Sequence, residues 1–278
     1  MTESDIAPTL IAVVMAAGGV AGCLGALLGI GGGVFLVPFL QVALGLDWPA
    51  ARGISLLTVI ATSSVVAARA SSRALINLRL AMLLLIPATG AGLIGGVTVV
   101  RFPAAVLTAI FAVLTAAIAA LMLSRIDRRN VIMDTSVDPG ALGGRFVDDD
   151  TGAAVVYRLK RMPIAAIVSL AGGYVSGIIG IGGGILQVPA LTSWCGVPIR
   201  AAAATSAVMI GVTAAASAPI FYGRGDINPP LSAAAVLGVL VGSQMGFWIS
   251  AHARVRWLKL LMAGVLAVVS IIYFRRVL

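Results

Sequence analysis

Charge is scarce in this sequence of 278 residues. Charged residues make up 10% of it, whereas hydrophobic residues make up 60%, a balance that excludes an ordinary soluble globular domain. There is one histidine, His252, and it falls at the end of an apolar run. An intramembrane hydrolase needs a nucleophile with a base positioned beside it, and no apolar run contains a histidine. We therefore expect no enzymatic activity, no bound metal and no cofactor.

Cysteine is almost absent as well. Cys23 and Cys195 are separated by most of the chain and form no CxxC motif, so packing among apolar side chains is the expected role of both. The first residues carry no Lys or Arg and no small-residue cleavage site, so a removable signal peptide is not expected. The net charge of +9 comes from arginines in loops, so binding to nucleic acid is not expected either.

Long runs without any charged side chain are the dominant feature. Runs of about 18 apolar residues are typical of membrane-spanning helices, and several here reach or exceed that length. The sequence therefore predicts an all-α polytopic membrane protein, with the lipid bilayer as its surroundings. The charge-free runs are Ile6–Leu46, Gly53–Ala68, Leu80–Val100, Phe102–Ser124, Met162–Ile199, Ala201–Gly223, Ile227–Ala251 and Leu260–Phe274.

Two of these runs are too long for one crossing. A continuous helix over Ile6–Leu46 would be about 60 Å long, against a hydrocarbon core of about 30 Å. Each long run contains a glycine cluster, "GIGGGVFLVP" at 29–38 and "GIGGGILQVP" at 180–189. Glycine enters turns without steric cost, so we expect a break at each cluster followed by a short helix. The prediction is eight long transmembrane helices plus two short ones.

The two clusters belong to an internal repeat. A shift of 151 residues superposes Gly29 to Gly33 on Gly180 to Gly184, and it also aligns Ser55 with Ser206 and Asn77 with Asn228. The sequence therefore divides into an N-terminal transmembrane repeat over 1–124, a polar linker over 125–161 and a C-terminal transmembrane repeat over 162–278. We interpret the linker mainly as a connector, with a regulatory or partner-binding role as the alternative.

Basic residues at both ends of the linker indicate its side of the membrane. Arg125, Arg128 and Arg129 begin it and Arg158, Lys160 and Arg161 end it, which places it in the cytoplasm by the positive-inside rule. If the short segments after the glycines cross the membrane, the halves are inverted and both termini lie outside. If those segments re-enter, both termini are cytoplasmic. Inverted repeats are our expectation.

The glycine breaks suggest a binding site. Broken helices at matching positions of two repeats are typical of the midplane site of a transporter, because the helix starts direct backbone N–H groups at an anion. The alternative is that the glycines only allow close helix packing. No Asp or Glu lies within an apolar run, so a cation site built from carboxylates is not expected. The predicted site glycines are Gly31, Gly32, Gly33, Gly182, Gly183 and Gly184, and a two-fold relation between the halves should bring the two sets together near the midplane.

Uncharged polar side chains near the breaks complete the predicted site. Hydroxyls and amides can solvate an oxyanion without burying a charge. The spacing of seven residues from Ser55 to Thr62, and from Ser206 to Thr213, puts each pair on one helix face. Gln41 and Gln187 lie beside the breaks. The alternative for any of the hydroxyls is a hydrogen bond to its own helix backbone.

These motifs carry a resemblance. The duplicated G-I-G-G-G-x-x-x-V-P, with "INL" at 76–78 and "DIN" at 226–228, resembles the sulfite exporter TauE/SafE family over nearly the whole chain. The resemblance implies a secondary transporter, expected to be an exporter, of small anions such as sulfite, sulfonates or related organic anions, located in the inner membrane. An anion channel is the alternative. An oligomer is possible but is not indicated. "RALIN" at 73–77 departs from the glycine and acidic pair that "GRGDIN" at 223–228 keeps.

Overall fold

Apolar helices build almost the whole described chain. The computed structural model describes residues 8–71, 74–124, 138–147 and 154–277. Within them, eight helices are long and apolar enough to cross a membrane, which confirms the all-α polytopic class. The elements are α1 (Pro8–Leu28), α2 (Gly33–Val42), α3 (Trp48–Ser71), α4 (Leu78–Thr98), the 3-10 turn η2 (Val99–Arg101), α5 (Ala104–Ser124), β1 (Gly144–Val147), β2 (Ala154–Tyr157), α6 (Met162–Ile179), α7 (Gly184–Ser193), α8 (Ile199–Gly223), α9 (Pro229–His252) and α10 (Val255–Val277).

The two short helices follow the glycine clusters as predicted. α2 and α7 have 10 residues each, about 15 Å of helix, or half of a hydrocarbon core. Each therefore covers only part of the membrane thickness. α3 departs from the charge-free run that predicts it, because it begins at Trp48 and so includes Arg52 inside the helix.

Long helices of the first half pack on long helices of the second half. α1 packs along α9, α4 along α6, α3 along α8, and α5 along α10. The 151-residue shift of the repeat relates α1 to α6 and α4 to α9. The packing of α1 on α9 is therefore equivalent to the packing of α6 on α4. The halves are therefore related by two-fold exchange and are interleaved. The inversion of the halves across a bilayer stays a prediction.

Glycines bring the exchanged helices into backbone contact. A Cβ on Gly22 of α1 would lie 2.8 Å from Val239 Cα of α9. The counterpart Gly173 of α6 meets the backbone of Ala88 of α4 in the same way. Small residues of this kind allow close approach between membrane helices, where no hydrophobic effect draws helices together. The same contact occurs twice under one shift, which supports the two-fold relation.

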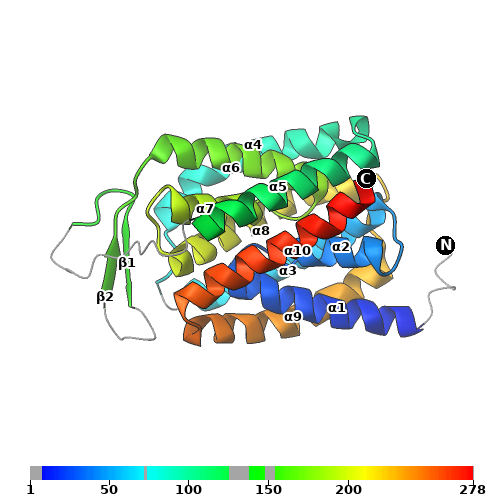
Figure 1. Cartoon of the computed structure of the whole chain (residues 1–278), viewed down its shortest axis with the longest axis horizontal. Helices are drawn as coiled ribbons and strands as arrows, with labels where there is room; N and C mark the ends of the chain where they lie inside the picture. The colour runs from blue at the N-terminus through cyan, green and yellow to red at the C-terminus, as the bar shows by residue number, and fades with distance from the viewer. Residues whose placement is uncertain (1–7, 72–73, 125–137, 148–153, 278) are drawn as a thin grey trace.

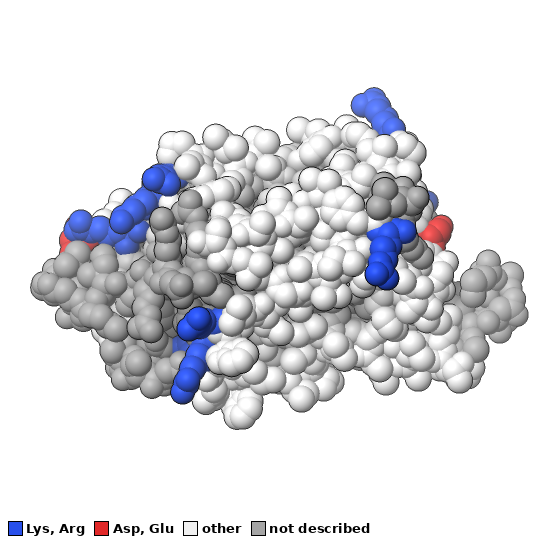
Figure 2. Space-filling model, in the orientation of Figure 1, with Lys and Arg blue, Asp and Glu red and all other residues white. Residues whose placement is uncertain are grey.

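The outer surface matches a membrane whose normal follows the long axis of the molecule. Figure 2 shows the charged side chains gathered at the two ends of the visible face, with a wide uncharged band between them. Exposed side chains on the helices include Ile86, Val97, Ile167, Val241 and Trp248. In Figure 1 the start of α1 and the end of α10 lie together at one end, and the β1–β2 hairpin lies at the other.

Part of the linker folds against the helices, which the sequence did not predict. β1 and β2 pair antiparallel, with Gly144 opposite Tyr157. Asn77, at the start of α4, donates from Nδ2 to the carbonyl of Leu142 at 2.9 Å and to that of Gly143 at 3.2 Å. Phe146 is buried, and burial raises the pKa of Tyr157, which the hydrogen bond from Asn77 partly offsets. The repeat boundaries within 125–161 stay a prediction.

Candidate functional site

The two glycine clusters adopt the same backbone conformation. Gly29 and Gly31 have φ of 69° and 76°, and their counterparts Gly180 and Gly182 have φ of 74° and 79°. Residues other than glycine rarely adopt this left-handed backbone region, because their Cβ comes too close to the following carbonyl oxygen. Two left-handed residues separated by one residue reverse the chain between α1 and α2, and again between α6 and α7. We call residues 29–33 and 180–184 the two glycine turns.

The glycine turns contact each other, as the sequence predicts. A Cβ on Gly33 would lie 2.9 Å from Ile181 Cα, and a Cβ on Gly184 would lie 2.9 Å from Ile30 Cα. Gly31 and Gly182 both face Val59 of α3, with distances of 3.4 Å and 3.0 Å from an added Cβ to Val59 Cγ1. The two turns therefore meet back to back inside the helix bundle.

Gly32 and Gly183 face in another direction. A Cβ on Gly32 would lie 3.0 Å from the carbonyl oxygen of Ala21 in α1, and a Cβ on Gly183 would lie 3.0 Å from that of Gly172 in α6. These two glycines pack a short helix on the long helix that precedes it. A branched side chain here would disturb that packing before it met any ligand, so such a variant does not test anion binding.

The short helices begin at these turns. The N–H groups of Phe35 and Leu36 both donate to the carbonyl of Gly32, at 3.1 Å, and those of Leu186 and Gln187 both donate to that of Gly183, at 3.2 Å. The first N–H groups of a helix lack acceptors within it and carry the positive end of the helix dipole. Two such helix starts therefore lie close to the contact between the halves.

The predicted hydroxyls are buried and hydrogen-bonded. Ser55 Oγ donates to the carbonyl of Gly180 at 2.9 Å, so it links α3 to the glycine turn of the other half. Ser206 Oγ donates to Gln187 Oε1 at 3.1 Å. Thr62 and Thr213 donate to carbonyls of their own helices at 2.8 Å and 3.0 Å, which is the alternative that the sequence left open. In this conformation, all four protons are used within the protein.

Gln41 lies apart from the other predicted polar groups. Its Oε1 accepts a hydrogen bond of 2.6 Å from the hydroxyl of Tyr273 in α10. Gln187, in contrast, lies at the second glycine turn through Ser206. The structure therefore brings together both glycine turns, Ser55, Ser206 and Gln187, and it places Gln41 against α10. Binding of a substrate by any of these residues stays a prediction.

A small pocket lies between the first glycine turn and the linker hairpin. It has about 30 Å³ of room for water, and Ala203, which contacts Gly29, lines it. Phe146 and Val147 of the hairpin cover one side of it, and the side chain of Arg200 also lines it. The wall also includes Ala26, Val66 and Phe247 of the helices and Leu75 of the connection between α3 and α4.

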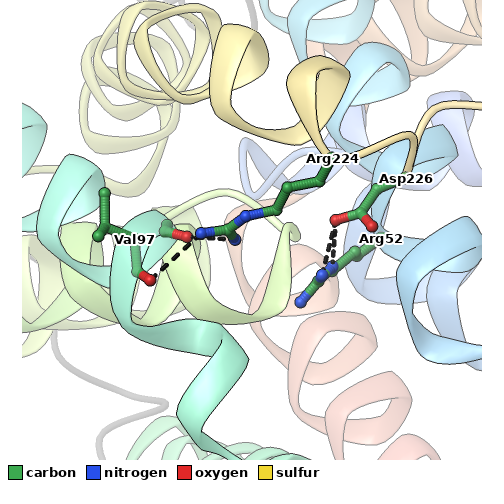
Figure 3. Close-up of polar contacts among 5 residues, drawn as sticks. Arg52, Val97, Arg224 and Asp226 are labelled. Atoms are coloured by element: carbon green, nitrogen blue, oxygen red, sulfur yellow. Dashed lines mark hydrogen bonds and ion pairs between the residues drawn. The ribbon is translucent and has the colours of Figure 1, made fainter.

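An ion pair at the end of the bundle away from the hairpin was missed by the sequence analysis. Arg52 donates to Asp226 Oδ2 from Nη2 at 2.6 Å and from Nε at 3.2 Å, and the two side chains are only 7% and 8% exposed (Figure 3). The Arg52 Cζ also lies 5.1 Å from the centre of the Phe221 ring. The partners are 174 residues apart, so no local sequence pattern indicates their pairing.

A second arginine fixes the same region. Arg224 donates from Nη1 to the carbonyl of Gly96 at 2.6 Å and from Nη2 to that of Val97 at 3.2 Å (Figure 3). Both carbonyls belong to the last turn of α4, where they lack partners within the helix. The guanidinium therefore satisfies the end of α4, and it joins this end of the first half to the α8–α9 loop of the second half.

In the part of the chain that the structure describes, eight long apolar helices in two interleaved halves, with paired broken helices between them, define a polytopic membrane protein of the transporter class. The family model described as "Sulfite exporter TauE/SafE" matches residues 14–273, so the chain belongs to this family. The chain is also similar to the "Probable membrane transporter protein YunE" of Bacillus subtilis (strain 168), with 23% identity over 265 residues, 93% of this chain and 95% of that protein. No solved structure matches the chain. The protein is thus an integral, multi-pass membrane transporter.

Proposed function

We propose that the protein is a secondary transporter of small sulfur-containing anions such as sulfite or sulfonates, and that it exports them. The observation that carries this proposal is the contact between the two glycine turns, each at the start of a short helix. The family described as a sulfite exporter supports the substrate class and the direction.

The proposed site lies between the glycine turns. Backbone N–H groups at the starts of α2 and α7 supply partial positive charge without a buried cation. Ser55 donates to the second glycine turn and Ser206 donates to Gln187 of α7, and we propose that each exchanges its present acceptor for a substrate oxygen when the halves move apart. Thr62 and Thr213 lie further along the same helices, and Gln187 supplies the amide that now accepts from Ser206.

The proposed orientation is that of an inverted repeat in the inner membrane. The start of α1 and the end of α10 lie at the end opposite the hairpin (Figure 1), so a cytoplasmic linker puts both termini outside. A cysteine added after the C-terminus should then react with a membrane-impermeant maleimide from the periplasmic side of intact cells. Labelling only after the membrane is permeabilised would contradict this orientation.

Transport of sulfite into proteoliposomes tests the function. A carrier should give uptake that saturates and exchanges against sulfite loaded inside, whereas linear flux without exchange would indicate the channel alternative. Imposed pH and sodium gradients identify the coupling ion. Ser55→Ala and Ser206→Ala should each weaken uptake, while Ser64→Ala is the matched control, because Ser64 is exposed and donates to Ile60 of its own helix. Equal uptake by protein-free vesicles would refute the proposal.

A further inference from the structure

The two ends of the central helix pair α3 and α8 are equivalent by the repeat but differ in structure. Towards the hairpin, the pocket lies beside this pair. The residues that line this pocket have counterparts, 151 positions away in the sequence, at the opposite end of the molecule. The counterparts of Val66, Leu75 and Ala203 are Ser217, Asp226 and Arg52.

At that opposite end, two of the equivalent positions carry an ion pair. The Arg52 guanidinium and the Asp226 carboxylate bridge the two halves at 2.6 Å. A Cβ on Gly180 of the second glycine turn would lie 2.8 Å from Arg52 Cβ, so Arg52 lies directly against that turn. On the hairpin side, apolar Ala203 lies against the first glycine turn in the same way. One end therefore carries a buried ion pair at positions where the other end has apolar residues and a pocket.

We propose that Arg52 is the binding group for the substrate anion on the side away from the linker, and that Asp226 occupies it when no anion is bound. This inference rests on the proposed function. A carboxylate and a sulfur oxyanion present oxygens of the same charge to the guanidinium fork, so they compete for the same N–H groups. The substrate displaces Asp226 from Arg52, and the ion pair that holds this end closed is then broken.

The low exposure of the pair makes this exchange selective for anions. A buried guanidinium that loses its partner is strongly unfavourable. The pair therefore opens when another anion replaces the carboxylate, and a cation or a neutral solute gives no such replacement. Arg52 lies against Gly180, so an anion held by Arg52 is already next to the second glycine turn.

Cysteine accessibility tests the closing role of the pair without any need for transport. Ser217 is 2% exposed and lies in α8, closer to the middle of the helix bundle than the ion pair. In a background with Cys23→Ala and Cys195→Ala, we expect Ser217→Cys to react slowly with a membrane-impermeant cationic thiosulfonate added from the side opposite the linker. In the same background, Asp226→Asn should raise the labelling rate of this cysteine about tenfold or more, because the variant loses the closed state. An unchanged rate would overturn the closing role.

Ligand-dependent stability tests the binding role. Sulfite should raise the unfolding temperature of the purified protein, because a ligand that binds only the folded state stabilises it. The rise should be larger in Asp226→Asn, where Arg52 has lost its charged partner, and absent in Arg52→Gln. Arg101→Gln is the matched control, since Arg101 is an exposed arginine on η2, the short turn that follows α4.

The outcomes separate the two proposals. If wild type gains stability with sulfite and Arg52→Gln gains as much, Arg52 does not bind the anion and the inference is wrong. If Asp226→Asn shows a smaller rise than wild type, Asp226 helps to bind the anion and does not compete with it, which also overturns the inference. If neither wild type nor Arg101→Gln responds to sulfite or transports it, the proposed function fails, while the labelling rates still decide whether the pair closes this end.

Discussion

Adding one methyl group at Gly22 should measure how tightly the halves are interleaved. A Cβ there would lie 2.8 Å from both Cα and O of Val239, whereas ordinary van der Waals contact is 3.4–4 Å. The backbones of α1 and α9 would have to separate by 0.6–1.2 Å, the difference between those distances. Overpacking of this kind costs about 1–3 kcal/mol. Gly22→Ala should therefore be less stable, by that amount, than an alanine substitution in a helix that meets no neighbouring atom.

Gly90→Ala is the matched control, because Gly90 is an exposed residue of α4 with no atom within 4 Å of an added Cβ. Alanine is a better helix former than glycine by about 0.5–1 kcal/mol, so this variant should be slightly more stable than wild type. Because both variants gain the helix preference of alanine, unfolding in mixed detergent micelles should separate them by about 1–3 kcal/mol, the cost of overpacking alone. Equal stabilities would refute the backbone contact between α1 and α9.

Three further outcomes are expected. Asn77→Ala should raise the rate of proteolysis in the linker, because the Asn77 side chain donates to the carbonyl of Leu142 beside the hairpin. Asn228→Ala is the control: it removes the equivalent helix N-cap, and each cap contributes about 1 kcal/mol. Burial raises the pKa of Cys195 to about 11, so a maleimide at pH 7.5 should leave it unlabelled until the protein is denatured, and fast labelling of the folded protein would contradict its burial. Ser55→Ala should lower the free energy of unfolding by about 1 kcal/mol through loss of the bond to Gly180, and no change would show that this bond is not stabilising.

The sequence predicted the features that depend on local composition and on the repeat. The charge-free runs indicated the spanning helices, and the glycine clusters indicated where α1 and α6 end. The shift of 151 residues predicted that Gly31–Gly33 and Gly182–Gly184 come together, because equivalent broken helices meet at a two-fold relation. Glycine is informative here, since its conformational and steric demands appear in the residue itself.

Contacts between distant side chains could not be predicted in the same way. Arg52 and Asp226 both lie at the ends of apolar stretches, where charges usually contact water or lipid headgroups, so nothing local indicated a buried pair. The directions of Gly32 and Gly183 towards α1 and α6 depend on the helix crossing, which a linear sequence does not give. The hairpin is built from a polar linker of mixed charge. Its buried residues, such as Phe146 and Tyr157, are too few to form an alternating pattern that would predict two strands.

The interleaving of the halves has a consequence for how the protein is made. α1 and α4 leave the ribosome long before α6 and α9, their packing partners, have been synthesised. Until those partners are made, the glycine-lined faces of α1 and α4 must contact lipid chains or an insertion factor. Neither half can reach its final structure alone, so a gene split within the linker should yield two fragments that are each degraded when expressed singly and that accumulate when they are produced together.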